Sequence, residues 1–280
     1  MFGKKKPEKQ PKQPKQQKPK KTVKKQEPIP GIMGMGDDYH IYHMTVMDRL
    51  KAAGIGIALG VAVGYVFFEN LVMAAVLSVI LVLVAQKPFE EFCKKQRQRR
   101  LLLQFKDLLE ALTASYSAGQ TTTSAFADAL EEMSNLYGEN ADIVAEVQMV
   151  NVGLQHNYNI EDLLLNFAQR SGLDDVDSFA NVFEVCNRKG GNLKQVVAES
   201  RGMINDKIEV EMEIQTMIAG SQNELNVMMC MPLVIMIAMK GLGTTSSGMA
   251  GIYNFIAKLV ALGIFGAAYV IGRKIVDIKV

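Results

Sequence analysis

The chain has 280 residues, 49% of them hydrophobic, and a formal net charge of +2 at pH 7. That small net charge hides a separation: residues 1–30 carry eleven Lys against two Glu, whereas residues 101–224 carry seven Lys or Arg against twenty Asp or Glu. A nucleic-acid-binding domain needs positive charge on its folded face, so an acidic middle behind a basic tail argues against that class. Cys93, Cys186 and Cys230 are widely spaced and form no metal-binding motif, so neither a zinc site nor a disulfide framework is expected.

Residues 1–38 are rich in Lys, Pro and Gln and are predicted to be a disordered tail. They are not a secretory signal, because the first long apolar stretch begins only near Ala52. Residues 39–51 form a predicted juxtamembrane segment, in which Tyr39 and Tyr42 are expected to lie at the membrane interface. The alternative for this segment, a metal site at His40 and His43, would need further ligands and is less favoured.

Residues 52–86 contain two uncharged runs that are separated by Glu69 and Asn70. As one helix they would extend about 51 Å, which is much longer than the roughly 30 Å of a hydrocarbon core. We therefore predict a transmembrane hairpin with its turn at Glu69-Asn70.

Residues 94–222 are predicted to form a soluble domain of six helices, because their apolar residues recur at steps of three and four. Four of these stripes are Phe105-Leu108-Leu109-Leu112-Tyr116, Phe126-Leu130-Met133-Tyr137, Ile143-Val147-Val150-Leu154 and Ile160-Leu163-Leu164-Phe167. A fifth helix is expected to start at Asp174–Asp177, where carboxylates favour a helix N-terminus. Gly119 and Gly138 are expected to end helices, and Asn140 and Asn159 to cap them.

A turn is predicted at Gly190-Gly191-Asn192, and the sixth helix then starts near Leu193. No helix breaker follows before Pro232, so this helix is expected to run from the soluble domain into the membrane. Such a continuous helix would transmit rotation or tilt between the two.

Residues 225–272 repeat the hairpin pattern, with a loop rich in Gly, Ser and Thr after Lys240, and residues 273–280 form a basic end. Basic residues flank the outer ends of both hairpins: Arg49, Lys51, Lys94, Lys95, Arg97, Arg99, Arg100, Arg273, Lys274 and Lys279. By the positive-inside rule, both termini and the middle domain are cytoplasmic. The predicted fold is thus an all-α integral membrane protein with about four transmembrane helices in two hairpins, flanking a cytoplasmic six-helix bundle.

The candidate interaction residues lie in turns and on the last long helix. They are Gly119, Gly190, Gly191, Asn192, Glu209, Glu211, Glu213 and Pro232. Gly190-Gly191 is interpreted as a steric turn rather than a phosphate site, because no P-loop or dinucleotide motif is present. The three Glu are either a docking face for a basic partner, a divalent-ion site or a solvated face. Pro232 is expected to kink its span, and Arg170, Arg188 and Lys189 are treated as surface cations.

Three motifs give the chain a family resemblance. They are Leu112–Gly119 (Leu-x-Ala-Ser-Tyr-Ser-Ala-Gly), Ala125–Leu130 on the next helix, and Lys189–Leu193 (Lys-Gly-Gly-Asn-Leu). With the hairpin layout, residues 45–280 resemble the type II secretion system F-domain family. The single domain is similar to TadB and TadC, the inner-membrane platform proteins of tight-adherence (Flp) pilus assembly.

The resemblance implies a platform in a bacterial or archaeal inner membrane that does no covalent chemistry and needs no cofactor. The implied partners are a cytoplasmic secretion ATPase, pilin subunits, membrane lipids and a second platform protein, either a paralogue or another copy. No nucleic-acid partner is implied. The alternative functions are a membrane adaptor or receptor and, less favoured, a small transporter, because the spans are nearly free of charge away from their ends.

The opposite charges of the tail and the middle domain suggest one further hypothesis. The tail is expected to exchange between anionic lipid headgroups and the acidic bundle, since each Lys near such a surface contributes about 1 kcal/mol. The hypothesis fails if deletion of residues 1–30 leaves ATPase affinity unchanged at both low and high salt.

Overall fold

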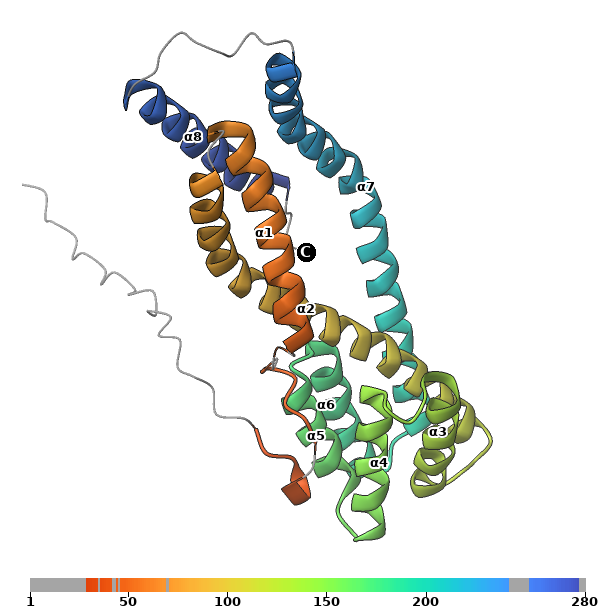
Figure 1. Ribbon diagram of the computed structural model, residues 1–280. Coiled ribbons are helices and arrows are strands. Elements are labelled where there is room, and N and C mark those ends of the chain that lie inside the picture. Colours follow the sequence, from red (N-terminus) through yellow and green to blue (C-terminus); the bar gives the residue numbers. More distant parts are fainter. Residues whose placement is uncertain are drawn as a thin grey trace, which may run out of the picture.

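The structure, a computed structural model, describes residues 29–34, 36–41, 44, 46–68, 71–241 and 252–276. Every regular element within these residues is a helix, which confirms the all-α class. In chain order the elements are η1 Ile32–Gly34, α1 Val46–Phe68, α2 Leu71–Ser117, α3 Thr122–Tyr137, α4 Asp142–Gln155, α5 Ile160–Ser171, α6 Asp174–Lys189, α7 Leu193–Gly241 and α8 Ile252–Val276. Short helices pack together at one end, and α1, α8 and parts of α2 and α7 extend away from them (Figure 1).

The packed end, which we call the bundle (residues 101–208), has one hydrophobic core. It consists of the C-terminal half of α2, the helices α3 to α6 and the first turns of α7. Phe105 of α2 lies at its centre, with ring centroids 5.9 Å from Phe167 and 5.5 Å from Phe179. The predicted apolar stripes supply this core, because residues three and four apart share one face of a helix.

The helix ends in the bundle follow the predicted turn residues with one exception. Gly138 and Gly190 are C-caps with φ of +80° and +71°, and Asn159 is the N-cap of α5. Asn140 is not a cap, because α4 is capped at Ala141. The backbone N–H of Ala141 donates to the carbonyl of Gly138, and this turn delays the start of the helix by one residue.

A row of glycines lets α1 pack closely against α2. Added Cβ atoms at Gly56, Gly60 and Gly64 would overlap Val82, Ser78 and Ala74, in that order, so the two helices are antiparallel. Small residues at every fourth position allow such close approach of backbones, and they are common where helices pack in membranes.

Two helices are long and apolar enough to cross a membrane, α2 over Val72–Ser117 and α7 over Leu193–Met239, and a shorter apolar helix covers Lys258–Gly272. Each long helix extends about 70 Å at 1.5 Å per residue. The apolar window of α7 has none of its residues buried within the described chain. Exposure of so many apolar side chains to water is unfavourable, whereas their contact with lipid is favourable.

The long helices join parts that the sequence analysis placed in separate domains. No break lies between the predicted hairpin at 52–86 and the predicted domain at 94–222, because α2 continues through Pro88. The predicted continuity of the last bundle helix into the apolar part is confirmed, because α7 starts at Leu193 and continues through Pro232 as far as Gly241. The predicted turn at Glu69-Asn70 lies between α1 and α2, outside the described residues, as do the loop residues 242–251 and the tail residues 1–28.

Candidate coupling site

A buried ion pair lies where α4 and α5 meet. Arg170 of α5 is 0% exposed and Glu146 of α4 is 2% exposed. The five N–H groups of a guanidinium all need acceptors when buried. Here the Glu146 carboxylate accepts from both Nη1 and Nη2, and Asn166 accepts from Nε at 2.8 Å. The other two acceptors are the Met149 sulfur, at 4.0 Å from Nη2, and the backbone carbonyl of Asp37, at 3.0 Å from Nη1.

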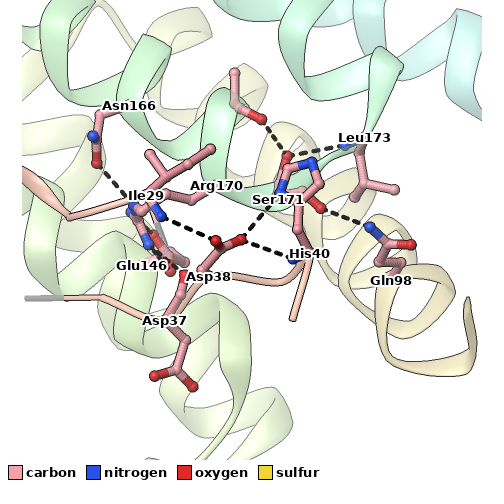
Figure 2. Close-up of polar contacts among 11 residues, drawn as sticks. Ile29, Asp37, Asp38, His40, Gln98, Glu146, Asn166, Arg170, Ser171 and Leu173 are labelled. Atoms are coloured by element: carbon pink, nitrogen blue, oxygen red, sulfur yellow. Dashed lines mark hydrogen bonds and ion pairs between the residues drawn. The ribbon is translucent and has the colours of Figure 1, made fainter. Parts of the chain in front are cut away.

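The Asp37 carbonyl belongs to a segment that precedes α1 and packs on the bundle. We call the described residues 29–34 and 36–41 the docked segment. The Tyr39 hydroxyl donates to Glu146 at 3.0 Å, and the Tyr39 N–H donates to the carbonyl of Arg170 at 3.0 Å. Gly36, with φ +100°, lies against the guanidinium so closely that a Cβ would overlap it. The segment therefore completes the shell around the ion pair (Figure 2).

Asp38 holds the docked segment in its folded shape. Its carboxylate accepts from the N–H groups of Ile29 and His40 and lies 3.0 Å from His40 Nδ1. Burial by itself would raise the pKa of Asp38, but these hydrogen bonds outweigh it and hold that pKa below the ordinary value of 3.8. The charged form of Asp38 is thus the form that stabilises the segment.

Arg97 ties the docked segment to α2. Its guanidinium contacts Asp142 of α4 at 2.6 Å and Asp37 at 2.9 Å, and it stacks over the Tyr39 ring at 4.5 Å. The hydrogen bond to Asp142 is the main cause of a raised pKa for Arg97. Burial, with the negative charges of Glu146 and Asp142, raises the pKa of Tyr39, so Tyr39 stays a hydrogen-bond donor.

Further hydrogen bonds spread the contact along the segment. Asn166 of α5 donates to the carbonyl of Pro30 at 3.2 Å and accepts from the N–H of Ile32 at 3.4 Å. The segment thereby joins α2, α4 and α5 just before the chain enters α1.

The structure corrects three predictions about these residues. The disordered tail was predicted to extend to residue 38, but Ile29 already donates to Asp38 within the docked segment, and contacts to the bundle begin at Pro30. Tyr39 is 3% exposed in the bundle core and not at a membrane interface, because its hydroxyl has a buried acceptor in Glu146. Arg170 is a buried cation and not a surface one. Tyr42 and His43 lie outside the described residues.

The predicted turn residues lie apart from the docked segment. Gly119 has φ +79° in the turn after α2. Gly190 ends α6, and a Cβ at Gly191 would overlap the Cys186 sulfur. Asn192 caps α7, since its side-chain oxygen accepts from the N–H of Gln195 at 3.2 Å. These positions have the steric and capping roles that a helix turn requires.

The predicted residues of α7 lie beyond the bundle. Glu209 and Glu213 are exposed, and Glu211 is partly buried. They follow Ile208, which packs on the edge of the core. Pro232 is exposed within α7. In the described part of the chain, no three His, Cys, Asp or Glu side chains lie close enough together to hold a metal ion.

The sequence did contain a signal for the ion pair. Glu146 lies three residues after Ile143 and four before Val150, on the apolar face of its helix. Arg170 likewise follows Phe167 by three residues on the apolar face of α5. Charges on apolar stripes are almost never buried unless they are paired, so these two opposite charges could have been predicted to meet.

Comparison with known proteins adds no identification. No family model, no curated protein and no solved structure matches this chain.

Proposed function

We propose that this chain is an inner-membrane platform for a Tad-type or type IV pilus, or for a type II secretion machine. In this proposal the bundle receives motion from a cytoplasmic secretion ATPase, and the membrane helices pass that motion to pilin subunits or an exported protein. The chain crosses the membrane four times, in two hairpins, with both termini and the bundle in the cytoplasm.

The observation that carries the proposal is the continuity of α2 and α7. Each is a single helix that begins or ends in the bundle core and has a long apolar part outside it. A helix is stiff along its axis, so a displacement of the bundle would displace both apolar parts. An adaptor that only recruits a partner would not require two continuous helices between the bundle and the membrane.

The docked segment supports the same mechanical role. It precedes α1 in the chain and is fixed to the bundle by contacts to a buried ion pair, which gives the bundle a third connection. The glycine row then couples α1 to α2. Three connections resist both tilt and twist, whereas a single tether transmits neither.

The proposal is tested by binding of the co-encoded secretion ATPase to the full chain in lipid nanodiscs. We expect retention of the ATPase that differs between ADP and a non-hydrolysable ATP analogue. A Glu209→Lys, Glu213→Lys variant tests the acidic face of α7, and Glu199→Lys, an exposed change within the bundle part of the same helix, is its matched control. Absence of ATPase binding to a folded chain would reject the platform and favour the adaptor.

A further inference from the structure

An apolar groove lies on the outer side of α6, next to the turn into α7. It has a volume of about 530 Å³ and is lined by Asn181, Val182, Val185, Cys186, Lys189 and Gly191. Val182 and Val185 are 50% and 52% exposed, although the inner face of α6 is buried in the core. Exposed valines in a concave site favour an apolar side chain from a partner.

The edge of this groove is basic in an otherwise acidic domain. Lys189 lines it, and Lys194 follows in the first turn of α7. Neither lysine has an ion-pair partner among the described residues, whereas Arg188 pairs with Glu184 at 3.1 Å. The groove therefore fits an apolar side chain with carboxylates beside it, and it disfavours the chain's own Lys-rich tail.

The bundle carries such a feature at the end of α3. Leu136 is 59% exposed. Glu132 lies one helical turn before it and Glu139 three residues after it, and both are exposed. In the described part of the chain, neither Glu forms an ion pair. We call Leu136 with Glu132 and Glu139 the acidic knob.

The knob and the groove do not meet within one molecule. α3 packs on α2 and α4, whereas α6 packs mainly on α5 and α7 and only slightly on α2, and the two helices lie on different sides of the bundle (Figure 1). We propose that the acidic knob of one copy inserts into the α6 groove of a second copy. Because the two surfaces differ, the contact is head-to-tail, and it repeats from copy to copy into a ring or a row.

Cys186 allows a direct test, because it is half-buried and lines the groove. A full-length chain with Leu136→Cys, Cys93→Ser and Cys230→Ser keeps one thiol on each proposed surface. Mild oxidation in native membranes should then give a ladder of dimers and larger species. The ladder should disappear when Cys186→Ser is added.

The matched control places the new thiol elsewhere on the bundle. Tyr158 is 44% exposed in the turn between α4 and α5, so Tyr158→Cys tests whether random collision gives the same ladder. Absence of a ladder with Leu136→Cys, or an equal ladder with Tyr158→Cys, would overturn the proposal. The first of these outcomes would leave the groove to a different acidic partner.

A second measurement uses charge and requires no cross-link. Lys189→Glu should weaken self-association of the full chain in nanodiscs or detergent by about tenfold, as measured by mass photometry. Adding Glu132→Lys to that variant should restore the wild-type distribution, because the ion pair is rebuilt with its charges exchanged. Equal association of all three chains, each shown folded by circular dichroism, would contradict the proposed contact.

Discussion

At the scale of single residues, the ion pair of Glu146 and Arg170 holds the docked segment to the bundle. A buried ion pair adds little stability when its two charges are compared with well-packed apolar groups, but loss of one partner leaves the other charge unpaired. Here the guanidinium also needs the Asp37 carbonyl, and the carboxylate also accepts from Tyr39. Loss of the ion pair should therefore also release the docked segment from the bundle.

We predict that Arg170→Met lowers the free energy of unfolding by about 3–5 kcal/mol, because the Glu146 charge is left buried alone. Tyr39→Phe removes only one hydrogen bond to a charged group and should cost about 1.5–3 kcal/mol. The double variant Arg170→Met, Glu146→Leu should be more stable than Arg170→Met alone. Chemical unfolding of the full chain in detergent measures all three. If the double variant is less stable than Arg170→Met, the unpaired charge of Glu146 is not the main cause of the lost stability.

Asp38 gives the docked segment a defined response to pH. Its pKa is lower in the folded chain than the ordinary value of 3.8, so its stabilisation is complete above that value. It is lost as the pH falls through the folded pKa. Hydrogen exchange of residues 36–41 should be faster in Asp38→Asn than in the wild type at pH 6, and the difference should shrink below about pH 4. A difference that stays constant with pH would rule out Asp38 as the group responsible.

At the scale of elements, the glycine row of α1 sets the distance to α2. Gly60→Leu should weaken the pairing by about 1–3 kcal/mol, since the side chain would overlap Ser78. Gly54→Leu is the matched control, because a Cβ at Gly54 meets nothing within 4 Å. The midpoint temperature of thermal unfolding in nanodiscs should be lowered by Gly60→Leu and nearly unaffected by Gly54→Leu. Equal effects would mean that α1 and α2 do not pack through this face.

The sequence predicted the elements better than their connections. Apolar steps of three and four indicated the helices of the bundle, and Gly138 and Gly190 marked helix ends, because these are local properties of the chain. The four-residue spacing of Gly56, Gly60 and Gly64 is a sequence signal for close helix packing, but it does not identify α2 as the partner helix. Pro88 did not end α2, although an interior proline removes one backbone hydrogen bond and favours a kink.

The docked segment was missed for a similar reason. Its residues are irregular, and several of their contacts lie more than 100 positions away in the sequence, such as Tyr39 with Glu146. Local composition near the Lys-rich tail suggested disorder instead. The sequence signal for this site was the pair of charges on apolar stripes, Glu146 and Arg170. That signal predicts an ion pair, but it does not predict the segment that covers it.

At the scale of the whole molecule, the proposed topology places the bundle and the loop after α7 on opposite sides of the membrane. A membrane-impermeant maleimide should label Cys186, which is partly exposed in the bundle, in inverted vesicles and not in intact cells. A second chain carries Cys186→Ser, Cys93→Ser and Cys230→Ser, so that Ser246→Cys provides its one thiol. The maleimide should label this thiol in intact cells and not in inverted vesicles. Labelling of Cys186 and Ser246→Cys from the same side would contradict the two-hairpin arrangement.

The central claim is that motion of the bundle reaches the membrane through continuous helices. Cys93 of α2 and Cys230 of α7 provide two native positions for spin labels once Cys186→Ser is introduced. In nanodiscs with the secretion ATPase, the distance between these labels should change when ADP is replaced by a non-hydrolysable ATP analogue. Gln215→Pro, which removes a backbone hydrogen bond and should kink α7 just beyond the bundle at a cost of about 3 kcal/mol, should alter the change, whereas Gln215→Ala should preserve it. An ATPase that binds in a nucleotide-sensitive way, with no change in this distance, would contradict the account.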